Sequence, residues 1–337
     1  MKAVPVLQLP RIVTIDSEVL PFHPSKFFIK NRVKLHVVLL YENEAENGKL
    51  WPAFNILARG IARGDHGDTD TVIDSTSGNY GVALAVAIRE CLRLDPLFPI
   101  RHVIAVVARS LPQGKRVRLQ HQGIELIDAE DAIDAMGVAE RVAKQRGYWY
   151  TRQYWNTDNS DGYRRVAEHI AEQLPMLGMV AWGVGSGGGC SGVMPVLQKC
   201  FKDRRFGVYR IAVVAEDGQK IGGVRDEAAL EPGSLEWRGN IDDVRFIGEE
   251  SSYRFSSALW RQQKSSPRNA CLGGPSTGFV AEGAYLAARR LGIMRKLDEI
   301  RAPDGFVHIL VPSLDKRTPY RSEYEQKGVY LAKSEWE

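Results

Sequence analysis

Apolar segments of two kinds alternate along the chain. Short runs rich in Val, Ile and Leu, such as Leu35–Tyr41 and His102–Val107, have the composition of buried strands. Longer segments, such as Pro52–Arg63 and Gly81–Leu92, are predicted to be helices. The alternation continues through Val72–Ile73, Gln113–Gln122, Ile124–Ile127, Ala129–Arg146, Met179–Trp182, Met194–Phe201, Tyr209–Ala215, Gly278–Leu291 and Phe306–Val311. This order predicts an α/β protein with parallel, doubly wound sheets.

Two polar, glycine-rich loops follow expected strands about a hundred residues apart. The first is Ser75–Ala85, which places hydroxyls, an amide and free backbone N–H groups at the start of a helix. The second is Gly183–Val193, whose dense glycines expose a row of N–H groups suited to a phosphate. The spacing predicts two α/β halves with a ligand cleft between them.

Composition excludes several other classes of protein. The chain has 337 residues, a net charge of +4 and no long Lys/Arg run, so nucleic-acid binding is not favoured. No apolar stretch reaches the roughly 20 residues that span a bilayer, so we expect no membrane association. The four cysteines and seven histidines lack metal-ligand spacing, which predicts no metal site and fits a cytoplasmic protein.

Four motifs together resemble the cysteine synthase and cystathionine β-synthase family, the fold type II pyridoxal-phosphate enzymes. Ser75–Ala85 resembles the family's Thr-Ser-Gly-Asn-Thr-Gly substrate loop, and Gly185–Val193 resembles its Gly-Thr-Gly-Gly-Thr phosphate loop. Gln153–Asn156 is similar to the family's Gln-Phe-x-Asn segment, whose Gln faces the substrate carboxylate. Gly274–Gly278 is similar to the segment whose Ser bonds the pyridine nitrogen.

The resemblance implies a fold and an assembly. We expect two doubly wound parallel-sheet domains with pyridoxal 5'-phosphate in the cleft between them. Residues 44–160 would form a smaller, mobile domain that carries the substrate loop. Residues 1–43 and 161–337 would form a larger domain that binds the cofactor phosphate. Family members are usually homodimers, so a homodimer is expected.

The resemblance also points to Lys49 as the lysine that binds the cofactor. Lys49 precedes Asn79 by thirty residues, which is the family spacing, and Ala53–Leu57 then falls into register without a gap. The Asp-Arg that follows the family lysine is Leu50-Trp51 here, and the preceding Ser is Asn47. A lysine in this role must lose its proton to act as nucleophile and base.

The remaining site residues are carried over from the family motifs. Asn79 would bond the ring oxygen of the cofactor, and Ser276 would face its pyridine nitrogen. A neutral hydroxyl there does not hold the nitrogen protonated. The phosphate would be held by Gly185, Ser186, Gly187, Gly188 and Gly189. The amino-acid substrate would be held by Thr76, Ser77, Gly78, Tyr80 and Gln153.

The implied reaction is β-replacement on an O-activated L-serine through an aminoacrylate. Arg225 lies in a segment that is glycine-rich in acetylserine enzymes, and a guanidinium clamps a phosphate bidentately, which favours O-phosphoserine over O-acetylserine. The aromatic Tyr80 also resembles the branch that forms 2,3-diaminopropionate with an amine, so sulfide and an amine both stay open as nucleophiles. Two alternatives are β-elimination, as in a serine or threonine dehydratase or a cysteine desulfhydrase, and a non-catalytic scaffold, suggested by Leu50-Trp51.

Overall fold

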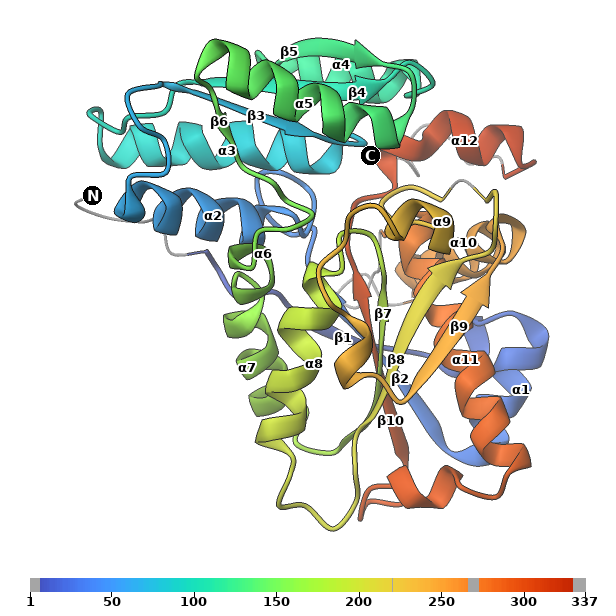
Figure 1. Ribbon diagram of the computed structural model, residues 1–337. Coiled ribbons are helices and arrows are strands. Elements are labelled where there is room, and N and C mark those ends of the chain that lie inside the picture. Colours follow the sequence, from blue (N-terminus) through green and yellow to red (C-terminus); the bar gives the residue numbers. More distant parts are fainter. Residues whose placement is uncertain (1–6, 220, 266–272, 330–337) are drawn as a thin grey trace.

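The computed structural model describes residues 7–219, 221–265 and 273–329. Its strands form two separate sheets, one of six strands and one of four, and helices cover both faces of each sheet (Figure 1). The predicted α/β fold with two sheets is therefore confirmed. No helix in the described part of the chain is long and apolar enough to cross a membrane.

The smaller sheet has the order β5-β4-β3-β6, and its neighbouring strands are all parallel. Successive strand residues point to opposite faces, so Val72 packs with α2 and α3 while Ile73 packs against α5. The strands are β3 (Thr71–Ser75), β4 (His102–Ala108), β5 (Glu125–Ala129) and β6 (Trp149–Tyr150). The helices are α2 (Leu50–Arg63), α3 (Asn79–Leu94), α4 (Gln113–His121) and α5 (Ala132–Arg146).

The larger sheet has the order β1-β2-β10-β7-β8-β9. Helices α1, α10 and α11 pack on one face, and α7 and α8 pack on the other. The strands are β1 (Ile12–Ile15), β2 (Val33–Leu39), β7 (Leu177–Gly183), β8 (Tyr209–Ala215), β9 (Asp243–Ile247) and β10 (Val307–Ser313). The helices include α1 (Phe22–Asn31), α6 (Asp158–Asp161), α7 (Arg164–Gln173), α8 (Gly188–Cys200), α9 (Glu227–Leu230), α10 (Glu249–Ser265), α11 (Pro275–Ile293) and α12 (Arg321–Gln326).

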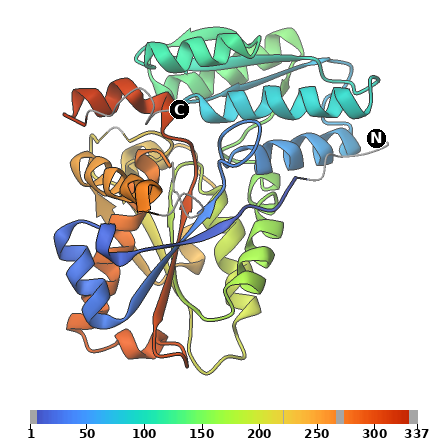
Figure 2. The same cartoon turned by 180° about the vertical axis from the view of Figure 1, so that it is seen from behind.

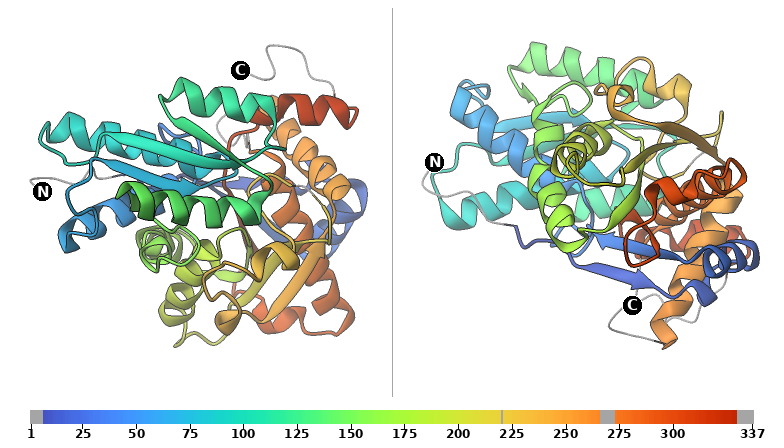
Figure 3. Two further views of the ribbon diagram at one scale, coloured as in Figure 1. Left: turned by 45° about the horizontal axis from the view of Figure 1, so that its top comes forward. Right: turned by 90° about the horizontal axis from the view of Figure 1, so that it is seen from below.

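Loops at the carboxyl ends of strands from both sheets meet at the junction of the two units. Lys49 lies between β2 and α2, residues 76–78 lie between β3 and α3, and residues 184–187 lie between β7 and α8. After β10 the chain returns to the smaller unit, where α12 lies beside it in the views of Figure 2 and Figure 3. Glu323 of α12 there approaches Lys115 of α4 at 3.7 Å. Open parallel sheets bind ligands at such carboxyl edges.

The sequence did not predict every element. β1 is an edge strand of four residues that pairs antiparallel with β2, so the larger sheet is not purely parallel. α10 is rich in Ser, Gln and charged residues, and its helical structure is supported by extensive packing against α11. Short or polar segments such as these take their structure from tertiary contacts rather than from their own pattern.

The second glycine-rich loop is shorter than predicted. Helix α8 begins at Gly188 rather than near Met194. A Cβ on Gly188 would lie 2.0 Å from Oδ1 of Asn159, and one on Gly189 would lie 2.0 Å from Nε1 of Trp182. These two glycines are therefore required by close packing inside a helix, which a sequence pattern does not distinguish from a flexible turn.

Close packing of α11 on α10 gives a test of the fold. A Cβ at Gly278 would lie 2.0 Å from the carbonyl oxygen of Ser252 and 2.4 Å from the amide nitrogen of Ser256. We expect Gly278→Ala to lower the free energy of unfolding by about 1–3 kcal/mol, because backbone atoms must move apart. Gly114→Ala is the matched control, since a Cβ on this helical glycine meets nothing within 4 Å. Equal unfolding curves for both variants in urea would contradict the described contact.

Candidate active site

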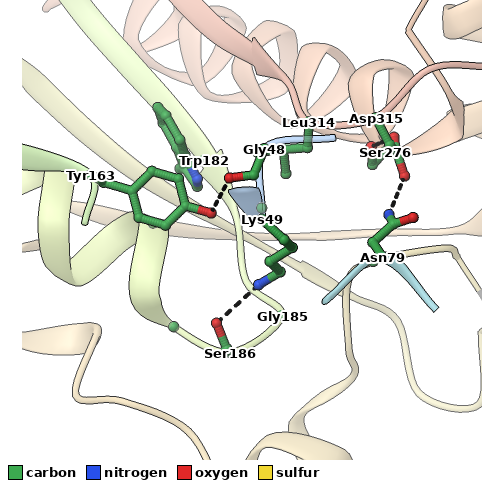
Figure 4. Close-up of a pocket in the computed structure, with 14 residues that line it drawn as sticks. Gly48, Lys49, Asn79, Tyr163, Trp182, Gly185, Ser186, Ser276, Leu314 and Asp315 are labelled. Carbon is green, nitrogen blue, oxygen red and sulfur yellow. Dashed lines mark hydrogen bonds between the residues drawn. The ribbon is translucent and has the colours of Figure 1, made fainter. Parts of the chain in front are cut away.

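Lys49 lies just before α2, and two hydrogen bonds hold the peptide group that joins Gly48 to Lys49. Its backbone N–H donates to Oδ1 of Asn47 at 2.9 Å, and the hydroxyl of Tyr163 donates to the carbonyl of Gly48 at 3.2 Å. The side chain points toward the loop after β7, where Nζ donates to Oγ of Ser186 at 3.1 Å (Figure 4). The amine thus connects the turn after β2 with the glycine-rich loop.

The amine of Lys49 is prepared to lose its proton. Burial, and secondly the positive charge of Arg225, lower the pKa of Lys49 to about 8. Both effects disfavour the charged ammonium. A substantial fraction of the amine is therefore neutral near pH 8, as a nucleophile toward an aldehyde requires.

The loop after β7 forms a cradle around Ser186. Gly187 has a left-handed backbone (φ +81°), and a Cβ on Gly185 would lie 2.3 Å from the carbonyl oxygen of Gly223. Oγ of Ser186 accepts from Nδ2 of Asn159 at 3.2 Å as well as from Lys49. The first N–H groups of α8 follow directly, so the loop leads into the positive end of a helix dipole.

The loop after β3 is stabilised by its own hydroxyl and by a left-handed glycine. Oγ1 of Thr76 accepts from the N–H of Gly78 at 3.0 Å and of Gly81 at 3.3 Å. Gly78 has a φ of +122°, a backbone conformation that residues with a Cβ rarely adopt. Ser77 is exposed and lines the larger cavity described below.

A buried carboxylate, Asp74, joins this loop to the segment that contains Gln153. Asp74 accepts from the N–H of Ser75 at 2.8 Å, from the N–H of Gln153 at 3.0 Å and from the hydroxyl of Thr151. Burial raises the pKa of Asp74 to about 7. The side-chain amide of Gln153 donates to the carbonyl of Ser75 at 2.7 Å. Tyr80 is 2% exposed and donates its hydroxyl to Oγ1 of Thr151 at 3.2 Å.

A second buried carboxylate, Asp315, joins the two units. Nδ2 of Asn79, from the smaller unit, donates to Asp315 at 3.0 Å (Figure 4). Oγ of Ser276, at the start of α11, donates to Asp315 at 2.6 Å. The hydroxyl of Tyr320 donates to it as well. The sequence predicted Asn79 and Ser276 as site residues but assigned no role to Asp315, which accepts a hydrogen bond from each of them.

Arg225 is fixed in the wall of the larger cavity that is described below. Its Nη1 donates to the carbonyls of Ala229 and Gly233, each at 3.1 Å. Its guanidinium carbon lies 3.8 Å from the ring centroid of Tyr154. Stacking and two hydrogen bonds hold the positive group in one orientation at the cavity wall.

Two adjoining cavities bring most of the predicted residues together. A narrow one of about 30 Å³ is lined by Lys49, Asn79, Ser276, Asp315 and the glycine-rich loop, among others. A larger one of about 410 Å³ shares Lys49, Asn79, Gly185 and Ser186 with it. The residues Thr76, Ser77, Tyr80, Gln153 and Arg225 line the larger cavity. Gly187 and Gly189 line the narrow one, whereas Gly78 and Gly188 line neither and have the structural roles given above.

These residues fit pyridoxal phosphate. A partly buried lysine of lowered pKa would supply the amine, and the glycine cradle at the start of α8 would supply uncharged donors for a phosphate. The residues of the cavity walls that the sequence did not predict include Tyr163, Lys115 and Asp315. No motif marked them, although Asp315 follows a buried strand at its carboxyl end, which is a position where ligands bind in such sheets.

Comparison with known proteins gives the family. Residues 24–293 match the model of the pyridoxal-phosphate dependent enzymes, and the chain belongs to this family. The protein is therefore a pyridoxal-phosphate-dependent enzyme, as predicted, and it is similar to cysteine synthases. It is 22% identical to the cysteine synthase of Staphylococcus aureus (strain N315) over 296 residues, which is 84% of this chain and 89% of the relative.

Other relatives extend the range of named activities. The N-(2-amino-2-carboxyethyl)-L-glutamate synthase of Cupriavidus metallidurans is 26% identical over 254 residues, covering 71% of this chain and 69% of the relative. The structure of an O-acetylserine dependent cystathionine β-synthase from Helicobacter pylori matches with a TM-score of 0.74, 22% identity and 96% coverage of both chains. An O-ureido-L-serine synthase matches with a TM-score of 0.72, 20% identity and coverage of 97% and 95%.

The lowered pKa of Lys49 predicts how cofactor binding depends on pH. We expect the rate at which apo-protein takes up pyridoxal phosphate to rise with pH around a midpoint near 8, because only the neutral amine reacts. We expect Arg225→Gln to shift this midpoint upward, because the substitution removes the positive charge that helps to lower the pKa of Lys49. The measurement is stopped-flow absorbance of the lysine-bound cofactor over a pH series.

Arg238→Gln is the matched control for this shift. Arg238 is exposed, stacks on Trp237 and pairs with Glu227 at 2.8 Å, and it lies outside both cavities. Its replacement is expected to leave the midpoint in place. A wild-type rate that still climbs above pH 10, as for an ordinary lysine, would show that Lys49 is not in the environment described.

Proposed function

We propose that this enzyme catalyses β-replacement on an O-activated L-serine, with Lys49 as the lysine that binds the cofactor and moves the Cα proton. The observation that carries the proposal is the position of the Lys49 amine, which lies at Ser186 of the glycine cradle and also lines the larger cavity. One group thus reaches both the proposed phosphate site and the proposed substrate site.

Each wall of the cavity has a part in this proposal. The bound cofactor supplies an electron sink that stabilises negative charge at Cα. Lys49 removes the Cα proton, and its lowered pKa makes the neutral, basic form available near pH 8. The loop with Thr76 and Ser77 offers N–H and hydroxyl donors to the substrate carboxylate. Asp74 orients this loop and Gln153 together through their backbone N–H groups.

The leaving group in this proposal is phosphate. Arg225 supports it, because a guanidinium already held by two carbonyls and an aromatic ring loses little freedom when it binds an anion. Lys115 adds a second positive group to the wall of the same cavity. The acetyl group of O-acetylserine is uncharged, so it would form an ion pair with neither Arg225 nor Lys115. O-phosphoserine is therefore favoured over O-acetylserine.

The nucleophile is sulfide or an amine. The volume of about 410 Å³ gives room for a nucleophile larger than sulfide beside the amino-acid substrate. The N-(2-amino-2-carboxyethyl)-L-glutamate synthase of Cupriavidus metallidurans is named for a product in which a glutamate nitrogen carries a 2-amino-2-carboxyethyl group. A similar amine substrate is within the proposal, and β-elimination is the competing reaction that the assay below distinguishes.

We also propose that residues 44–160 move as a smaller domain over the cofactor. The contacts that such motion would break and form include Asn79 with Asp315 and Lys115 with Glu323, which connect the two units. The homodimer remains a prediction of the family resemblance, and the cytoplasmic location remains a prediction from the cysteine content.

The direct assay uses the holoenzyme with O-phosphoserine or O-acetylserine, each with sulfide or with L-glutamate as the amine. We expect a product in which the nucleophile is joined to the three-carbon unit of serine, detected by mass spectrometry. Release of pyruvate without such a product would favour β-elimination. No reaction of either serine ester in a protein that holds the cofactor would favour the scaffold alternative.

Arg225→Gln tests the leaving group. We expect kcat/KM for O-phosphoserine to fall by about 10- to 100-fold, since a hydrogen bond to a charged group is worth about 1.5–3 kcal/mol. The value for O-acetylserine changes much less, and the ratio of the two substrates cancels any common effect through Lys49. Arg238→Gln is the control, and an equal fall for both substrates would remove the case for a phosphate contact.

A further inference from the structure

Two side chains of opposite charge lie together in the wall of the larger cavity. Lys115 of α4 and Glu323 of α12 both line it, and Nζ of Lys115 lies 3.7 Å from a carboxylate oxygen of Glu323. A direct hydrogen bond between charged groups is shorter, at about 2.7–2.9 Å. Each of the two groups therefore keeps hydrogen-bonding capacity for a ligand in the cavity.

The carboxylate of Glu323 is held in place by the packing of α12 on α10. The ring centroid of Tyr324 lies 4.7 Å from that of Tyr253 and 4.4 Å from that of Trp260. The hydroxyl of Tyr324 lies 2.8 Å from Oγ of Ser256. Tyr253 then donates its own hydroxyl to Glu323 at 3.1 Å. The short helix α12 thus presents one carboxylate to the cavity in a fixed position.

Lys115 lies between the substrate loop and α12. A Cβ at Gly78 would lie 3.7 Å from Cβ of Lys115, so the side chain starts against the loop after β3. Its Nζ lies 4.6 Å from the ring centroid of Tyr320, and the side chain is 13% exposed. The charged pair therefore adjoins the loop that is proposed to hold the carboxylate of the serine substrate.

The surroundings of Glu323 favour a positive group. Burial raises the pKa of Glu323, and so do the charges of Asp315 and Glu249. The charge of Lys115 and the hydrogen bond from Tyr253 act in the other direction. An ammonium group that enters the cavity is attracted by these carboxylates, whereas a hydrosulfide anion is repelled by them. A molecule with both an amino group and a carboxylate matches the pair as a whole.

We propose that Glu323 and Lys115 form the subsite for the nucleophile, and that this nucleophile is an amino acid. Glu323 accepts hydrogen bonds from its amine, and Lys115 pairs with its carboxylate. The inference rests on the proposed β-replacement and selects an amine over sulfide. Lys115 serves both substrates in turn, since the phosphate leaves before the nucleophile adds. No bond of the protein forms or breaks in this binding step.

The first test compares nucleophiles in the wild-type holoenzyme, with whichever serine ester reacts in the assay above. The twenty standard L-amino acids and sulfide are each supplied, and the best amino acid is then compared with the amine that lacks its α-carboxylate. We expect kcat/KM for the amino acid to be higher by about 10-fold or more, because the amine alone loses the contact with Lys115. Equal values, or a product with sulfide alone, would overturn the inference.

Glu323→Gln tests the contact with the amine. Glutamine keeps an oxygen that accepts from Tyr253 but has no negative charge. We expect KM for the amino acid to rise by about 10-fold, while kcat at saturating amino acid and KM for the serine ester change little. Glu325→Gln is the matched control, because Glu325 also belongs to α12 but pairs with Arg321 at 2.9 Å and lines neither cavity.

The outcomes separate the subsite from the reaction itself. An unchanged KM for the amino acid in folded Glu323→Gln shows that this carboxylate only secures α12, and it overturns the inference. If Glu323→Gln does not fold, the comparison of nucleophiles in the wild type still decides. Holoenzyme that forms no product with sulfide or with any amine, from either serine ester, would refute the proposed function and is a separate result.

Discussion

The structure is organised around one partly buried lysine amine between two sheets. Lys49 extends from the turn after β2, and its Nζ meets Ser186 in the loop after β7. Burial and the charge of Arg225 lower the pKa of this amine to about 8. Charged groups are costly to bury, so the walls around Lys49 must supply polar contacts without a carboxylate that would stabilise the ammonium. Ser186 and the glycine cradle meet this requirement.

The same constraint explains why the two buried carboxylates lie away from the amine. Neither Asp74 nor Asp315 contributes to the shift of the Lys49 pKa. Asp74 holds the substrate loop and Gln153 from beneath, while Asp315 holds Asn79 and Ser276 on the other side of the cavity. Each carboxylate thus positions residues of the site without neutralising the positive group. The arrangement thus keeps the amine of Lys49 apart from the two carboxylates that position other residues of the cavity walls.

Sequence reasoning predicted the α/β fold, and most of the residues that it predicted for the site line the cavities, because both depend on local motifs. Lys49 was found by its spacing to Asn79, and the structure places both in the same cavity walls. Gly188 illustrates the limit, since the pattern of a phosphate loop does not reveal that a glycine lies against Asn159 within a helix. Asp315 and Tyr163 were missed because their roles arise from contacts with Ser276 and Gly48, which are distant in the sequence.

The central claim is that the partly buried amine of Lys49 binds the cofactor. The most direct measurement is borohydride reduction of the cofactor-loaded protein, followed by digestion and mass spectrometry of the modified peptide. The account predicts a pyridoxyl phosphate group on Lys49 and none on Lys115, the other lysine described in the walls of these cavities. It also predicts no modified peptide from Lys49→Ala. Modification of Lys115 or of another lysine, with Lys49 unmodified, would contradict the account.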